Sequence, residues 1–252
     1  MEIGAIVVGC VTGFLSAYFG IGGSSIDTPA LRLFLGLPPL LALATPLPLA
    51  VLKAAIASVA FERQHLVNFR IALYSVLAGA PGIVVGSYLT AVVSGKALML
   101  LTAVVLFFVG IDFIVKELTE KAFAVEKPSR TPSAAFVMAV VFPIGILAGL
   151  LANGGGIFLV PAYVIFFRLR IKEAIATSLL TVIVMSVPGS VIQYHLGHVD
   201  LRIMAFMAIG AIPLSYVGAK LDIRTKSKTV MLLYGIVMTV FAVYFFITQL
   251  EG

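Results

Sequence analysis

The chain has 252 residues, of which 61% are hydrophobic and 11% charged, with a mean hydropathy of +1.15. Because about 25% of the residues of an ordinary soluble domain are charged, this composition excludes a water-soluble globular protein. The formal net charge of +6 is typical of membrane proteins with basic cytoplasmic loops and does not indicate nucleic-acid binding, and the single cysteine excludes an internal disulfide.

Apolar runs long enough to span a bilayer predict an all-α integral membrane protein, built as a helical bundle. The predicted segments are 3–20, 24–36, 40–61, 69–93 and 96–115, then 134–152, 156–168, 172–193, 201–221 and 227–249. The second segment of each five has about 13 residues and covers about 20 Å, less than the hydrocarbon core of about 30 Å. We therefore expect each half to begin with a broken or re-entrant hairpin, followed by three full spans.

The two halves of the chain are related by an internal repeat. A shift of 132 positions places Gly13 on Gly145 and stays in register without a gap as far as Phe113 on Phe245. Matches occur in turns and in helix interiors, for example Pro81 with Pro213. The sequence therefore predicts a first transmembrane repeat (1–115), a linker (116–133) and a second repeat (134–252). Residues 132 positions apart are called counterparts below.

An odd number of segments in each half predicts that the two halves have opposite orientations in the membrane. The loop charges agree, because the turn at 37–39 is uncharged whereas its counterpart region carries Arg168, Arg170 and Lys172. The positive-inside rule then places the linker in the cytoplasm and both termini outside. Inverted repeats are typical of secondary transporters, which bind substrate near the midplane where broken helices of both halves meet.

A glycine-rich cluster separates the first two segments in each half. The cluster residues are Gly22, Gly23, Ser24 and Ser25 in the first half and Asn153, Gly154, Gly155 and Gly156 in the second, followed by Pro29 and Pro161. Adjacent glycines are poor helix formers, and the short helix after them begins with unpaired N–H groups and a partial positive charge. Two such helix starts facing each other predict a site for a small oxyanion. The alternative is that these glycines only permit close helix packing.

Lys53 lies well inside its apolar segment, where a lysine is costly unless it faces a partner or a wet cavity. Its counterpart, Met185, is apolar. Lys53 is expected to contact an anionic substrate, to form an ion pair or coupling pair with Asp27, or to extend to the membrane surface. Thr45 and Thr177 are counterparts and are interpreted, with Pro29 and Pro161, as structural or hinge positions.

Neither a metal site nor a hydrolytic centre is indicated. His195, His198 and Asp200 fall in a predicted external loop and are interpreted as polar loop residues. Asp27 and Asp112 are the carboxylates in or near apolar segments, too few for a metal path. Because neither an HExxH nor a GxSxG motif occurs, we expect no enzymatic activity, no metal and no cofactor.

The glycine motifs resemble those of the TauE/SafE family of sulfite and organosulfonate exporters. The run from Asn153 to Gly156 with Pro161 matches an NGGGxxxxP pattern. The first motif, from Gly20 to Pro29, is looser, because Ile21 and Ser24 replace the Asn and the third Gly. The resemblance extends over essentially the whole chain, including its duplicated organisation.

This resemblance implies a transporter that exports sulfite or organosulfonates such as sulfoacetate across the cytoplasmic membrane, coupled to the proton gradient. In the expected mechanism the two halves rock around the site and expose it to each side in turn. An anion channel with the same site and a non-transporting membrane scaffold remain as alternatives. The expected partners are a small anion and the lipid bilayer, with small-residue helix faces that could form a homodimer.

Overall fold

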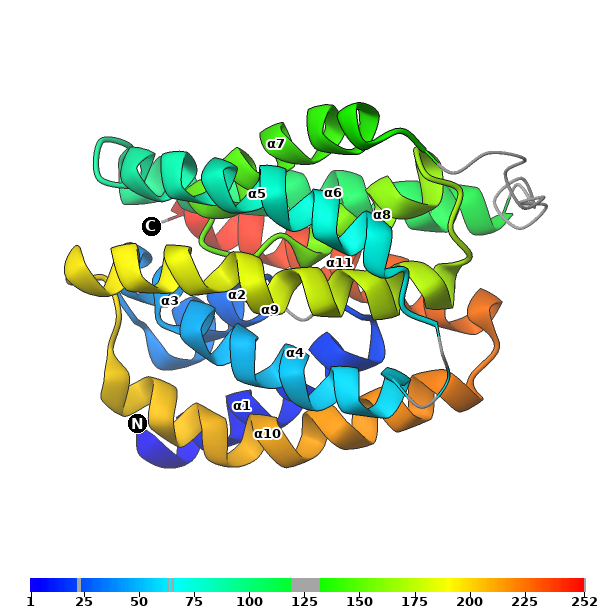
Figure 1. Ribbon diagram of the computed structural model, residues 1–252. Coiled ribbons are helices and arrows are strands. Elements are labelled where there is room, and N and C mark those ends of the chain that lie inside the picture. The colour runs from blue at the N-terminus through cyan, green and yellow to red at the C-terminus, as the bar shows by residue number, and fades with distance from the viewer. Residues whose placement is uncertain (22–23, 63, 65, 119–131, 252) are drawn as a thin grey trace.

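The structure is a computed structural model that describes residues 1–21, 24–62, 64, 66–118 and 132–251. Within these residues the chain forms eleven α-helices and no strand (Figure 1). In chain order they are α1 (Glu2–Tyr18), α2 (Asp27–Leu35), α3 (Pro39–Ala44), α4 (Pro46–Glu62), α5 (Phe69–Leu89), α6 (Gly95–Leu118), α7 (Ala134–Leu150), α8 (Gly156–Ile165), α9 (Ile171–His195), α10 (Leu201–Arg224) and α11 (Ser227–Glu251).

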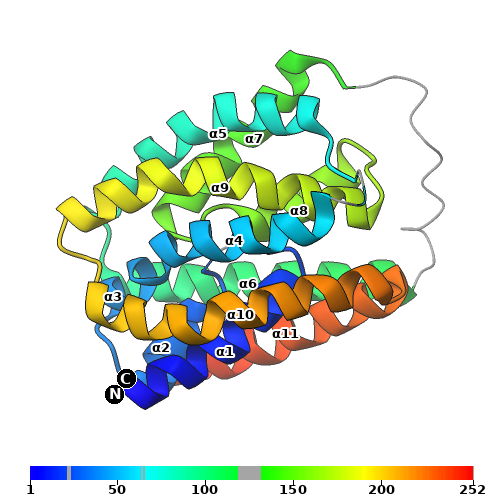
Figure 2. The ribbon, with the colours of Figure 1, turned by 60° about the horizontal axis from the view of Figure 1, so that its bottom comes forward.

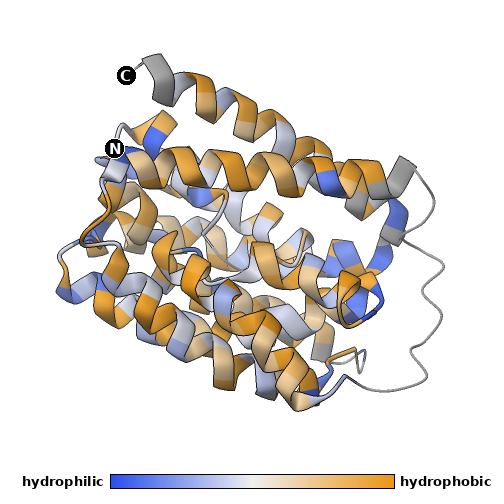
Figure 3. Ribbon diagram, turned by 90° about the horizontal axis from the view of Figure 1, so that it is seen from above, coloured by the Kyte–Doolittle hydropathy of each residue, from blue (hydrophilic) through white to orange (hydrophobic). Residues whose placement is uncertain are grey.

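The helices confirm an all-helical protein of the membrane class. Six segments among the described residues are long and apolar enough to cross a membrane: Pro39–Phe61, Phe69–Leu89, Gly95–Val115, Ile171–His195, Leu201–Arg224 and Lys228–Thr248. The hydrophilic residues gather mostly toward the two ends of the bundle (Figure 3). As predicted, α2 and α8 are short, with 9 and 10 residues.

The predicted segment 40–61 differs from its counterpart in one respect. It is divided into α3 and α4 at Thr45, whereas α9 continues unbroken past Thr177. The reason is local, because Pro46 and Pro48 have no backbone N–H to donate to carbonyls one turn earlier.

The two halves pack against each other in a reciprocal manner. Helix α1 lies along α10, and its counterpart α7 lies along α5 (Figure 2). Helices α6 and α11 pack together, as do α4 and α9, so these elements meet their own counterparts. Both chain ends lie at one end of the bundle, while α6 ends and α7 begins at the other (Figures 1 and 2). Exchanging the halves therefore leaves the main pattern of neighbouring helices unchanged.

Glycines allow backbones to touch in the two closest helix pairs. A Cβ atom at Gly86 of α5 would lie 2.0 Å from the carbonyl oxygen of Ile146 on α7. The counterpart contact is nearly identical, with 2.3 Å from Gly218 of α10 to the carbonyl oxygen of Phe14 on α1. Small residues permit such close packing of membrane helices. These glycine faces are therefore occupied within the chain and do not supply a dimer interface.

We expect Gly86→Ala and Gly218→Ala to lower the thermal unfolding temperature of the detergent-purified protein, because each new methyl group meets backbone rather than a movable side chain. Gly4→Ala is the control, since its Cβ would lie 3.9 Å from the nearest side-chain atom. At Gly4 the better helix propensity of alanine favours the folded state by about 1 kcal/mol, so Gly4→Ala should not lower the unfolding temperature. An unfolding temperature of Gly86→Ala at or above that of the wild type would contradict this account.

Candidate functional site

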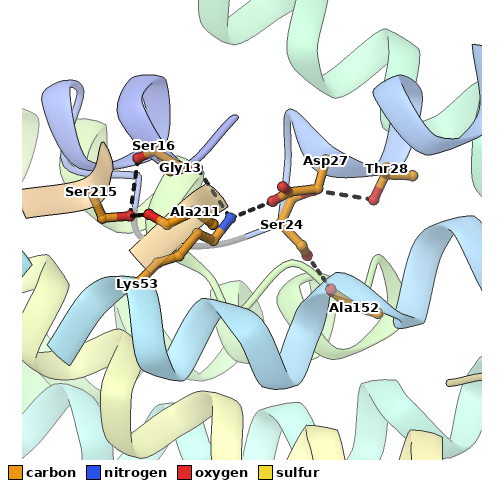
Figure 4. Close-up of polar contacts among 9 residues, drawn as sticks. All are labelled: Gly13, Ser16, Ser24, Asp27, Thr28, Lys53, Ala152, Ala211 and Ser215. Carbon is orange, nitrogen blue, oxygen red and sulfur yellow. Dashed lines mark hydrogen bonds and ion pairs between the residues drawn. The ribbon is translucent and has the colours of Figure 1, made fainter. Parts of the chain in front are cut away.

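The two glycine breaks contact each other directly. The Ser24 hydroxyl donates to the Ala152 carbonyl at 2.5 Å (Figure 4). The Ser24 backbone N–H donates to the Asn153 carbonyl at 3.4 Å. On the other side of the junction, a Cβ atom at Gly156 would lie 1.5 Å from the Ile21 carbonyl oxygen. Only glycine fits there, so the start of α8 lies against the first break. Gly22 and Gly23 lie outside the described residues.

Each break turns through a residue in the left-handed region, and the other half binds that residue's carbonyl. The first is Gly20, with φ +67, and its counterpart is Ala152, with φ 43. Ser178 of α9 donates to the Gly20 carbonyl at 2.9 Å, as Ser24 does to Ala152. A residue other than glycine rarely adopts the left-handed conformation. The hydrogen bond from Ser24 of the other half therefore stabilises the backbone of Ala152 in this conformation.

Both short helices begin at this junction with polar groups around them. Asn153 is 4% exposed, and its side-chain oxygen accepts from the Gly155 N–H at 3.0 Å. The Ser25 hydroxyl is buried just before α2 and has no hydrogen-bond partner among the described residues. Pro29 is the third residue of α2, where a missing N–H costs little, and Pro161 lies inside α8. In the first turns, Thr28 and Phe158 already donate to the Ser24 and Gly155 carbonyls. The N–H groups of Asp27, Gly156 and Ile157 have no acceptor within their own helices, which suits anions.

Lys53 and Asp27 form an ion pair beside the breaks. The Lys53 Nζ lies 2.5 Å from the Asp27 Oδ2 and 3.4 Å from the Ser16 hydroxyl, and both charged side chains are 0% exposed (Figure 4). Of the interpretations left open by the sequence, the structure therefore shows pairing with Asp27, and complete burial excludes a lysine that extends to the membrane surface. The Asp27 Oδ1 has no hydrogen-bond partner among the described residues.

The second half fills the equivalent place without charge. The counterparts of Asp27 and Lys53 are Leu159 and Met185, both 0% exposed. Their side chains lie 3.5 and 3.6 Å from the position that a Cβ of Gly155 would take. Replacing a buried ion pair by apolar residues is often neutral or stabilising. The packing at this position therefore does not require an ion pair, and only the first half has one.

Thr45 and Thr177 lie at contacts between the halves. The Thr45 hydroxyl accepts from the backbone N–H of Asp200, and Thr177 accepts from that of Asn68, each at 3.0 Å. Asp200 and Asn68 are counterparts, and their side chains cap the starts of α10 and α5. The match of the two threonines across the repeat thus has a structural explanation in this state of the protein.

The sequence analysis missed Asp222, because the predicted segment ended one residue earlier. Helix α10 includes Asp222 and buries it completely, and neither carboxylate oxygen has a hydrogen-bond partner among the described residues. The interpretation that only Asp27 and Asp112 lie in or near apolar segments was therefore wrong. Nearby, the Lys172 ammonium donates to the Asp222 carbonyl at 2.9 Å. The counterpart of Asp222 is the polar residue Thr90, which lies inside the predicted segment 69–93. This match across the repeat could have indicated that Asp222 belongs to its helix.

His195, predicted to lie in a loop, is the last residue of α9. The loop that follows, which contains His198 and Asp200, takes part in hydrogen bonds and a helix cap. His198 Nδ1 lies 2.8 Å from the Gln193 side-chain oxygen, and Gln193 donates to Thr90 at 3.1 Å. Partial burial lowers the pKa of His198 below its ordinary value, which favours the neutral ring. Asp200 caps α10. The part of the chain that the structure describes contains no group of three or more His, Cys, Asp or Glu arranged to hold a metal.

The fold and the site together define a multi-pass helical membrane protein in which two broken-helix hairpins meet beside a buried ion pair. Comparison with known families then gives a more specific assignment. The family model described as "Sulfite exporter TauE/SafE" matches residues 5–245, and the chain belongs to this family of membrane transporters. No solved structure matches the chain significantly.

Curated relatives are similar over most of their length. "Probable membrane transporter protein YunE" of Bacillus subtilis (strain 168) is 23% identical over 256 residues, covering 92% of this chain and 93% of that protein. A "Probable membrane transporter protein" of Xylella fastidiosa (strain 9a5c) is 25% identical over 251 residues, covering 97% and 96%. These names agree with a transporter class and do not specify a substrate.

The ion pair makes a prediction about stability. Lys53→Met or Asp27→Leu alone leaves one buried charge without its partner, which costs about 3–5 kcal/mol. The double variant Asp27→Leu/Lys53→Met reproduces the apolar pair of the second half and should unfold at a higher temperature than either single variant. Thermal unfolding of the four proteins forms a double-mutant cycle. Additive losses in the double variant would show that the two charges do not depend on each other.

Proposed function

We propose that the protein is a secondary transporter that exports small sulfur-containing oxyanions, sulfite or organosulfonates such as sulfoacetate, across the cytoplasmic membrane. The observation that carries this proposal is the direct contact between the two glycine breaks, with Lys53 buried beside them. Membership of the TauE/SafE family supports the transporter class and suggests the sulfur anion.

The site offers the groups that a sulfonate or sulfite needs. Its oxygens would accept hydrogen bonds from N–H groups at the starts of α2 and α8, which carry partial positive charge. Ser25 and Asn153 would add neutral donors from the two breaks, and Lys53 would add the charge. Backbone N–H groups, neutral side-chain donors and one ammonium are the groups that bind oxyanions in proteins.

Opposite orientation of the halves is part of the proposal. It is supported by the reciprocal packing of α1 with α10 and of α7 with α5, and by the separation of the chain ends from the junction between α6 and α7. In this arrangement the linker is cytoplasmic and the termini are outside. Alternating access would arise as the two repeats rock around the breaks, with Pro29, Pro161, Thr45 and Thr177 as hinge or contact positions.

The close contact at the breaks favours a carrier over a channel. Gly156 lies against the Ile21 carbonyl so closely that a methyl group does not fit. A channel needs a path that is open to both sides of the membrane at once. A carrier opens its substrate site to only one side at a time. Flux that exceeds the rates of carriers would contradict this preference.

The first test is thermal unfolding of the purified protein with sulfite, sulfoacetate, methanesulfonate, taurine, sulfate, thiosulfate or acetate. A ligand that binds only the folded state stabilises it, by about 2.7 kcal/mol at a concentration of 100 times its Kd. We expect selective stabilisation by sulfite or a sulfonate, and no shift in Asp27→Leu/Lys53→Met. Glu2→Leu/Arg202→Met is the matched control, because it makes the same exchange at an exposed ion pair.

Stabilisation of the wild type and the control, but not of the buried double variant, would support the site. If no sulfur anion stabilises the wild type and none crosses liposomes that contain it, the proposed substrate is wrong and the scaffold alternative gains support. If the buried double variant responds like the wild type, Lys53 does not bind the anion.

A further inference from the structure

We propose that Asp27 and the transported anion compete for Lys53, so that the protein binds one proton, on Asp27, with each anion. This inference rests on the proposed function and concerns the same site. It assigns to Asp27 a role that follows from where the charges lie and not from the glycine motifs.

The argument begins with the charge of the buried pair. Lys53 and Asp27 are 0% exposed and 2.5 Å apart, so the pair has no net charge. An anion that reached Lys53 would place two negative charges beside one cation, in a buried site where solvent screening is weak. A buried charge without compensation is strongly unfavourable and in practice is neutralised by protonation. Binding of the anion therefore requires that Asp27 take up a proton.

No second cation contacts Asp27 among the described residues. The cation of α2 itself, Arg32, lies in the last turn of that helix and donates to the Leu37 carbonyl at 2.8 Å. Helix α2 packs against α1, α3 and α11. The only carboxylate or cation of α1 is Glu2, which pairs with Arg202 at the exposed start of that helix. Helix α3 has no charged residue, and those of α11, Lys228 and Glu251, lie near its two ends. Among the described helices around α2, Lys53 is therefore the cation that contacts Asp27.

The atoms of Asp27 fit both states. In the paired state its Oδ2 accepts from Lys53, while its Oδ1 is buried without a hydrogen-bond partner among the described residues. After protonation the carboxylic acid is neutral, and its O–H can donate to an anion oxygen. The site then contains one ammonium, one anion and one neutral acid, and it keeps zero net charge for a monovalent anion.

The second half cannot repeat this step, because Leu159 and Met185 occupy the counterpart positions. The stoichiometry is therefore one proton for each anion. Transport of a monovalent sulfonate would then be electrically neutral, and the membrane potential would not drive it. An exporter of this kind works down the concentration gradient of its anion, and an inward proton gradient opposes export.

Methanesulfonate is the probe, because its single charge does not change over the pH range used. We expect its Kd for the wild type, from ligand-dependent thermal shifts, to rise about tenfold per pH unit wherever binding requires proton uptake. In Asp27→Asn, which resembles the protonated acid, the Kd should not change with pH. Asp222→Asn is the control, since it removes another fully buried carboxylate and should keep the wild-type slope.

Wild-type protein in liposomes provides a second measurement that does not depend on any variant folding. An outward methanesulfonate gradient should move protons outward as well, one per anion, as reported by a pH-sensitive dye inside. The rate should not respond to an imposed membrane potential.

A pH-independent Kd, proton movement opposite to the anion, or flux that follows the membrane potential would overturn the inference while leaving an anion transporter in place. A flat profile in Asp222→Asn with a normal slope in Asp27→Asn would assign the proton to Asp222 instead. If methanesulfonate neither binds nor crosses while sulfite does, the sulfonate class is wrong, and if no sulfur anion binds, the proposed function fails with the inference.

Discussion

Backbone polar groups in a bilayer must find partners inside the protein, and this constraint determines how the two broken helices are arranged. Each break exposes a carbonyl at a left-handed residue, Gly20 or Ala152, and a serine of the opposite half donates to it. Neither break is complete without the other half. The place where the helices are interrupted is therefore also the place where the two repeats meet, and a substrate bound there would contact both.

Charge enters this otherwise symmetrical arrangement from one side only. The second half packs Leu159 and Met185 where the first half has Asp27 and Lys53, so the same fold accommodates either pair. Since a buried ion pair is weak evidence for stability, we propose that the exception in the first half serves a ligand and not packing. In our account the second half supplies the NGGG motif for the oxygens of the anion, and the first half supplies the charge.

Much of the fold could be predicted because its signals are local. Apolar runs, glycines and prolines gave the helices within a few residues, and the 132-residue shift identified the counterparts. The partner of Lys53 could not be chosen, because spacing does not show which way a side chain points. The contacts of Thr45 and Thr177 with caps of the opposite half depend on tertiary packing. Asp222 was missed since helix ends are the least certain part of such a prediction.

The central claim is that the protein transports the anion by alternating access and that the buried pair of Lys53 and Asp27 is part of its binding site. Substrate counterflow of radiolabelled sulfite in liposomes tests it directly, because only a carrier lets unlabelled sulfite on one side drive uphill accumulation of the label. We expect transient accumulation with the wild-type protein and none with Asp27→Leu/Lys53→Met. Absence of counterflow with a folded wild type, or equal accumulation in the double variant, would contradict the account.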